Sequence, residues 1–92
     1  MKIRIDFPTI LTLQYLPASQ NHELAIIIQK AFEDVYNLPS NFWHWNSTWI
    51  KITEQQRDFL INRIKSKIDD TTDMERVAKS YHAIKQLNGF YK

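Results

Sequence analysis

The sequence contains no cysteine and only one glycine, Gly89, and these two scarcities exclude several kinds of site. Without cysteine there is no disulfide framework, no thiolate metal ligand and no cysteine nucleophile, which suits a reducing compartment. Phosphate-cradling loops need glycines so that backbone amides can approach the ligand closely. A P-loop, a dinucleotide-binding fingerprint and a nucleophile elbow of the Gly-x-Ser-x-Gly kind are therefore excluded.

Long hydrophobic runs are also missing. The longest apolar run covers residues 24–28, which is far too short to span a bilayer. Asp6 and Pro8 interrupt any apolar region of a signal peptide. The 92 residues, 43% of them apolar, suffice for one small domain with a modest core. We therefore expect a single domain over residues 1–92, located in the cytoplasm and not in a membrane.

The N-terminal segment predicts one or two strands. Residues 2–7 alternate polar and apolar, which is the period of a half-buried strand, and Pro8 should end it. In residues 9–16, Leu11, Leu13 and Tyr15 alternate with polar residues, which favours a second strand. A short helix that opens at Pro8 is the alternative, because proline suits a first helical turn.

Three helices are predicted after this segment. The first runs from a cap at Ser19 or Asn21 to about residue 36, and the second from a capping box at Thr53 and Gln56 to about residue 68. The third follows a second capping box at Thr72 and Glu75 and ends near Gly89. Apolar residues at helical spacing define the expected inward faces: Leu24, Ile27, Ile28, Ala31 and Val35; Leu60, Ile61, Ile64 and Ile68; Met74, Val77, Ala78, Tyr81 and Ile84.

All three tryptophans, Trp43, Trp45 and Trp49, lie between the first two helices. Aromatic and β-branched residues favour strands, so residues 42–46 and 48–52 predict a tight β-hairpin that turns near Asn46. The predicted fold is a small α+β domain, in which a mostly antiparallel sheet, built from the N-terminal strand or strands and this hairpin, packs against three helices.

Part of this pattern resembles the DinI-like family of small bacterial and prophage proteins, which modulate the recombinase of the DNA-damage response. The resemblance lies in residues 1–5, in 23–32 and in 49–53 leading into a helix, and it spans roughly residues 1–68. It implies a three-stranded sheet with two helices on one face. The acidic last helix carries the family's activity, whereas residues 53–68 have four basic and two acidic side chains here. The family's activity is therefore not carried over.

Catalytic and metal-binding constellations are not apparent. The three histidines, His22, His44 and His82, show no metal-ligand spacing, and the acidic pairs at 33–34 and 69–70 are typical of a solvated helix face and of a break between helices. We therefore expect no enzyme, no metal and no cofactor. Only a pocket that joins His44, His82 and a carboxylate would change this expectation.

The hairpin and the second helix predict a protein-binding surface. If Ile50 and Ile52 point inward, Trp49 and Lys51 point outward, and exposed tryptophan is typical of binding hot spots. The alternative is that the tryptophans fill the core. Phe59 lies off the apolar stripe of its helix, either exposed or covered by the third helix. The predicted protein-binding residues are Trp43, Trp45, Trp49, Lys51, Phe59 and Arg63.

The uneven charge of the chain supports an alternative, which is nucleic-acid binding. Residues 1–50 carry three basic and four acidic side chains, whereas residues 51–92 carry nine basic and six acidic ones. Basic residues on the last two helices could contact phosphates. They are Arg57, Lys65, Lys67, Arg76, Lys79 and Lys85.

The functional hypothesis from the sequence is a non-enzymatic small regulator or inhibitor that docks on a larger protein or nucleoprotein complex. Phage inhibitors, immunity proteins and antitoxins are of this size and type. A basic nucleic-acid-binding module is the alternative. Ile26 and Phe59, which both lie off their stripes, indicate a homodimer interface as a further alternative.

Overall fold

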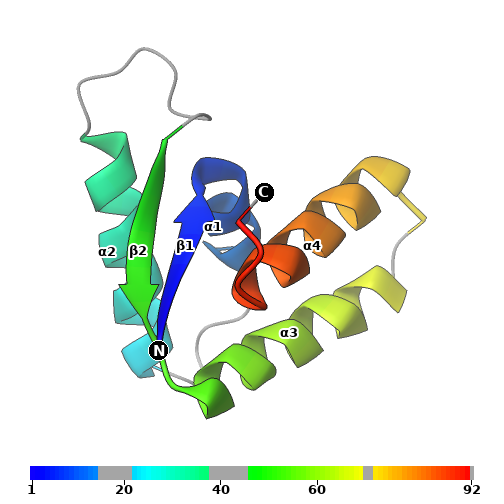
Figure 1. The fold of residues 1–92 in the computed structure, drawn as a ribbon. Helices are drawn as coiled ribbons and strands as arrows, with labels where there is room; N and C mark the ends of the chain where they lie inside the picture. The colour runs from blue at the N-terminus through cyan, green and yellow to red at the C-terminus, as the bar shows by residue number, and fades with distance from the viewer. Residues whose placement is uncertain (15–21, 38–45, 70–71, 92) are drawn as a thin grey trace.

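A computed structural model describes residues 1–14, 22–37, 46–69 and 72–91 of the chain. In chain order, its elements are β1 (Lys2–Asp6), α1 (Phe7–Gln14), α2 (His22–Tyr36), β2 (Ser47–Lys51), α3 (Glu54–Asp69) and α4 (Met74–Leu87). The fold is α+β, with a two-stranded antiparallel sheet and four helices in the described ranges (Figure 1). None of these helices is long and apolar enough to cross a bilayer.

The sheet pairs the N-terminal strand with the second strand of the predicted hairpin. β1 and β2 run antiparallel, with Arg4 opposite Trp49. Alternation buries Ile3, Ile5 and Ile50 on one face, as the sequence predicts. Among the described residues, β1 is thus the partner of β2. Residues 42–45 of the predicted first hairpin strand lie outside the described residues, and Asn46 is not in a strand.

Helix α1 replaces the second strand predicted for residues 9–16, so that prediction is wrong and the helical alternative is right. Asp6 caps the helix, since its Oδ1 accepts the Thr9 N–H at 3.0 Å. Pro8 fits the first turn, where its missing N–H costs nothing. The helix buries Thr9, Ile10 and Leu13, which are spaced as on one face of a helix. The predicted strand would instead have placed Leu11 and Leu13 on the same face, whereas Leu11 is only partly buried.

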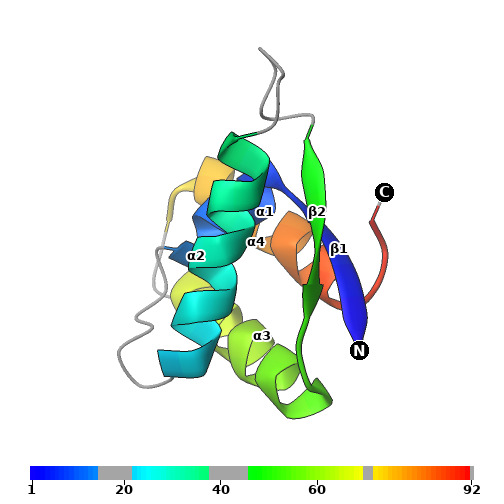
Figure 2. The same cartoon turned by 90° about the vertical axis from the view of Figure 1, so that its left-hand side faces the viewer.

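Helices α2 and α3 follow their predictions closely. α2 buries Leu24, Ile28, Ala31 and Val35, and it lies along the apolar face of the sheet (Figures 1 and 2). The capping box of α3 is confirmed. The Gln56 N–H donates to Thr53 Oγ1 at 3.1 Å, and the Thr53 N–H donates to Gln56 Oε1 at 2.9 Å. α3 buries Leu60, Ile61 and Ile64.

Helix α4 is rotated relative to its prediction. The residues expected to face inward include Met74 and Tyr81, which are 77% and 59% exposed. Ala83, Gln86 and Leu87 are buried instead. The cap also differs, because Asp73 rather than Thr72 accepts the Glu75 N–H, at 3.0 Å. α4 packs on α1 and β1 with this unexpected face, and α3 packs on α4.

Candidate functional site

The outer sheet face is the face of β1 and β2 opposite the buried isoleucines. It carries Lys2, Arg4, Trp49 and Lys51, and the C-terminal segment brings Tyr91 against it. Helices cover the other face of the sheet (Figure 2). Trp49 is 61% exposed near the middle of β2. The predicted outward orientation of Trp49 and Lys51 is therefore confirmed.

Arg4 is held in place beside Trp49. Its Nε donates to Ser47 Oγ at 2.8 Å, and its guanidinium carbon lies 4.3 Å from the centroid of the Tyr91 ring. A guanidinium over an aromatic ring gains a cation–π attraction. Because these contacts fix the side chain, Arg4 has little conformational entropy left to lose.

Lys2 and Lys51 form a like-charge pair across the sheet. They are directly opposite in the antiparallel register, and both are exposed. The flanking bonds, from Ile52 N–H to Met1 carbonyl and from Phe7 N–H to Asn46 carbonyl, make Lys2–Lys51 a non-hydrogen-bonded pair, in which side chains approach most closely. Like charges in this position are unfavourable. The described ranges contribute no carboxylate partner to either lysine.

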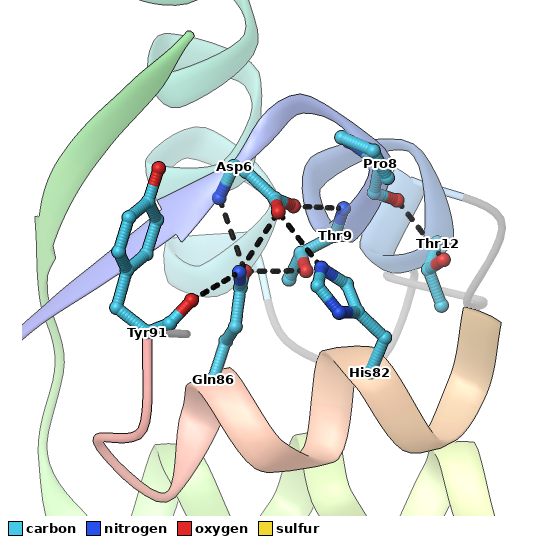
Figure 3. Close-up of polar contacts among 7 residues, drawn as sticks. All are labelled: Asp6, Pro8, Thr9, Thr12, His82, Gln86 and Tyr91. Atoms are coloured by element: carbon cyan, nitrogen blue, oxygen red, sulfur yellow. Dashed lines mark hydrogen bonds and ion pairs between the residues drawn. The ribbon is translucent and has the colours of Figure 1, made fainter. Parts of the chain in front are cut away.

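A second group of polar residues joins the end of β1 to α1 and α4 (Figure 3). Gln86 is 1% exposed, and all four of its side-chain hydrogen-bonding positions are used. Its Oε1 accepts from the Asp6 N–H at 3.1 Å and the Thr9 hydroxyl at 2.6 Å. Its Nε2 donates to Asp6 Oδ2 at 2.8 Å and to the Tyr91 carbonyl at 3.3 Å. We call Asp6, Thr9, His82 and Gln86 the Gln86 network.

His82 completes the network and forms the one pairing of histidine with a carboxylate among the described residues. Its Nε2 lies 2.7 Å from Asp6 Oδ2. An imidazole beside a carboxylate is an acid–base arrangement, but it needs a nucleophile or substrate within reach. The nearby hydroxyl belongs to Thr9, which is fully buried and donates to Gln86. The geometry therefore favours a structural role for the network.

Two further features of the described residues bear on catalytic chemistry. The hollow between α1 and α2, about 170 Å³ in volume, is lined by Leu13, Gln14, Ala25, Ile28 and Gln29, none of which titrates. Nowhere in the described ranges do three metal-ligating side chains gather. His44, which the sequence analysis considers together with His82 and a carboxylate, lies outside the described residues.

The Asp6 carboxyl titrates below its usual range. Burial alone raises its pKa, but the hydrogen bonds from the Thr9 N–H, His82 and Gln86, together with the charge of His82, outweigh burial and lower the pKa. On acidification the unfolded chain therefore takes up this proton before the folded one does. The contribution of Asp6 to stability is complete above its unfolded-state pKa of about 3.9 and is lost as the pH falls through the lower folded-state pKa.

Asp6→Asn should consequently remove a pH-dependent part of the stability. We expect the free energy of unfolding in urea to be lower for the variant than for the parent protein at pH 6. The difference should shrink as the pH falls below about 4, because the parent carboxylate becomes protonated there. Because the two proteins are compared at the same pH, the contributions of the other carboxylates to the free energy of unfolding cancel in the difference. A difference that stays constant down to about pH 2 would show that Asp6 titrates without consequence for folding.

The predicted protein-binding residues are divided by the fold. Trp49 and Lys51 share the outer sheet face, whereas Trp43 and Trp45 lie outside the described residues. Phe59 and Arg63 are on α3, where the Phe59 ring packs half-buried against the core and the Arg63 guanidinium carbon lies 5.3 Å from its centroid. Phe59 is thus mostly used in packing.

The basic residues predicted for nucleic-acid binding are spread over α3 and α4, and two of them are paired with acids. Arg57 lies 3.5 Å from Glu54 and 3.1 Å from Asp58. Arg76 lies 3.8 Å from Asp73. The remaining four are exposed: Lys65, Lys67, Lys79 and Lys85.

Sequence reasoning did not predict that Lys2 and Arg4 of β1 belong to the outer sheet face, and it did not predict the Gln86 network. The alternation of residues 2–7 does place Lys2 and Arg4 on the outside, but only the strand pairing brings them beside Trp49. Nothing in the local sequence marks Gln86 as buried. Comparisons of the chain with models of protein families, with curated proteins and with solved structures give no match. The resemblance to the DinI-like family therefore stays a prediction.

Proposed function

We propose that the protein is a non-enzymatic regulator or inhibitor that docks on an acidic surface of a larger protein through its outer sheet face. The observation that carries this proposal is the exposure of Trp49 between Arg4, directly opposite, and the cross-strand lysines Lys2 and Lys51. An exposed tryptophan in the centre of a surface provides the apolar anchor of a hot spot. The surrounding cations select for carboxylates and speed association.

The Lys2–Lys51 pair supports an anionic partner. Because like charges directly opposite each other destabilise a sheet, this arrangement costs stability in the free protein. A carboxylate bound between the two ammonium groups would remove that cost. Locally unfavourable choices of this kind concentrate at functional sites, where binding compensates for them.

A protein partner is favoured over nucleic acid by the small number of cations on the outer sheet face. The net charge of the chain is only +2, and the face contributes three basic side chains. Nucleic-acid binding of useful affinity commonly neutralises about six to ten phosphates. The six helix cations lie on α3 and α4 rather than on this face, and two of them, Arg57 and Arg76, are paired with acids.

Affinity capture tests the proposal. The parent protein, Trp49→Ala and Lys51→Glu would each be immobilised and exposed to lysate of the source organism, and the bound proteins quantified by mass spectrometry. We expect a partner whose recovery falls at least about tenfold with either variant. Lys30→Glu is the matched control, since it makes the same charge change on an exposed position of α2. Equal loss with Lys30→Glu, or loss of capture after nuclease treatment, would refute a protein docking site on this face.

Lys51→Glu also distinguishes function from folding. In the variant, the carboxylate at position 51 would lie opposite the Lys2 ammonium group. The variant should therefore be more stable than the parent by about 0.2–1 kcal/mol. Loss of capture together with a gain in stability cannot come from misfolding. A loss of both would mean that Lys51 acts mainly in holding the sheet together.

A further inference from the structure

The free edge of β2 is the side of that strand that points away from β1. Met1 and Ile52 exchange two hydrogen bonds, from the Met1 amino group to the Ile52 carbonyl at 2.8 Å and from the Ile52 N–H to the Met1 carbonyl at 3.0 Å. In an antiparallel ladder, such pairs alternate with pairs that exchange no hydrogen bond. With the observed register, the N–H and carbonyl groups of Ser47, Trp49 and Lys51 therefore point to the free edge.

No described element satisfies these backbone groups. Among the described residues, the main chain of Ser47, Trp49 and Lys51 has no hydrogen-bond partner. Helix α2 packs on β2, but in Figure 2, which shows the molecule from this side, it lies beside the strand rather than across its free edge. An open edge of this kind is a template for pairing with another extended chain.

The opposite edge of the sheet, on β1, is partly covered. The Asp6 N–H points away from β2 and donates to Gln86 Oε1 at 3.1 Å. Helix α4 packs on β1, and Gln86 also holds the Tyr91 carbonyl there, at 3.3 Å (Figure 3). Of the two described strands, β2 therefore has the more open edge.

The charge beside the free edge selects its occupant. Lys51 is exposed on the outer sheet face, with Lys2 opposite it and Arg4 on the same face. The one acidic side chain of the two strands, Asp6, is bound in the Gln86 network. A second copy paired with β2 would bring two such cationic faces together, and their like charges would repel each other. An acidic segment of a partner protein would instead place carboxylates beside them.

We propose that the partner supplies an extended acidic segment, which adds to the free edge of β2 as a third, antiparallel strand. This inference rests on the proposed function and specifies the chemistry of its partner. Segment residues directly opposite Trp49 and Lys51 lie on the outer sheet face, so Asp or Glu there meets the Lys51 ammonium group. The alternate residues point to the other face, where β-branched side chains suit a strand. Backbone hydrogen bonds then provide affinity, and the alternating carboxylates provide specificity.

Amide hydrogen exchange, followed by NMR on the protein alone, tests whether the edge is free. The amides of Trp49 and Lys51 should exchange fast, because they have no acceptor in the described chain. The Ile50 amide, which bonds to β1, should exchange slowly and serves as the control. Slow exchange of the Trp49 amide would show that the edge is already occupied, by another segment or by a second copy, and would overturn the proposal.

A peptide provides the probe for the strand addition. We would use an acetylated and amidated hexapeptide of alternating threonine and glutamate. At about ten times its dissociation constant, it should slow the exchange of the Trp49 and Lys51 amides about tenfold. A peptide with lysine in place of glutamate should bind at least about tenfold more weakly. Equal binding of the two peptides would refute selection by charge.

Methylation of the peptide nitrogens separates strand addition from contact through side chains. The glutamates opposite Trp49 and Lys51 would form the hydrogen bonds, so N-methylation of the glutamates should abolish the protection. N-methylation of the threonines, whose N–H groups would point to solvent, should leave it. Equal protection by both methylated peptides would overturn the proposal. A captured partner that leaves the Trp49 amide unprotected would refute strand addition alone, whereas failure of the capture experiment would refute the docking function itself.

Discussion

Replacing Gln86 with leucine is expected to lower the free energy of unfolding by about 3 kcal/mol. Leucine has a similar size, but it leaves the Thr9 hydroxyl and the Asp6 N–H in the interior without an acceptor. Each such unsatisfied buried group costs about 1–3 kcal/mol. Urea unfolding followed by circular dichroism measures the change.

Gln55→Leu provides the matched control for this variant. Gln55 is an exposed glutamine of α3, so the same substitution should change the stability by less than about 0.5 kcal/mol. If Gln86→Leu costs no more than Gln55→Leu, the network does not stabilise the fold. The reason for the orientation of α4 would then be packing by Ala83 and Leu87 alone.

Leu13→Ala is expected to destabilise the protein by a similar amount, about 3 kcal/mol, because Leu13 is fully buried on the inner side of α1. The cost combines the lost burial of the side chain with the cavity that remains. Thermal unfolding should show this as a decrease in Tm of about 4–8 °C for each kcal/mol in a domain of this size.

Leu11→Ala is the informative comparison for Leu13. Helix α1 leaves Leu11 only partly buried, so its replacement should cost clearly less than that of Leu13. In the strand that the alternation of residues 9–16 predicts, both leucines would point to one face and cost alike. Equal losses would therefore contradict the helix.

The structure of residues 7–14 illustrates a limit of short-range patterns. Eight residues fit the period of a strand and that of a helix almost equally well, and the decision lies with Asp6 and Pro8 at the start. A cap and a first-turn proline fix the helix, while the alternation of Leu11 and Leu13 is coincidental. The longer helices α2 and α3 were predictable because four buried positions in α2 and three in α3 repeat at helical spacing.

Helix α4 was placed correctly in the sequence but with the wrong face inward. Apolar residues decide the orientation of most amphipathic helices, and here they form the stripe with Met74 and Tyr81. In the structure the buried face contains a polar residue, Gln86, which is hydrogen-bonded to Asp6 and Thr9. These partners are about 80 residues away in the chain. No single-sequence pattern reports that distant pairing.

Only the β2 half of the candidate site, Trp49 and Lys51, could be predicted from the sequence. The outward direction of Trp49 and Lys51 follows from the period of one strand. The neighbourhood that makes them a cationic face depends on which strand pairs with β2 and in which register. The sequence offers three candidate partner strands, residues 2–7, 9–16 and 42–46, and strand period could not choose among them.

The Gln86 network also sets the order in which the protein can fold. It joins the first strand to the last helix, which are separated by almost the whole chain. Closing such a long loop costs entropy before any contact compensates for it, so these contacts form late. During synthesis on the ribosome, β1 and α1 therefore lack their contacts with α4 until α4 has emerged. Until then Ile5, Ile10 and Leu13 are not fully covered. Interaction with chaperones should accordingly be strongest on incomplete chains that end before α4.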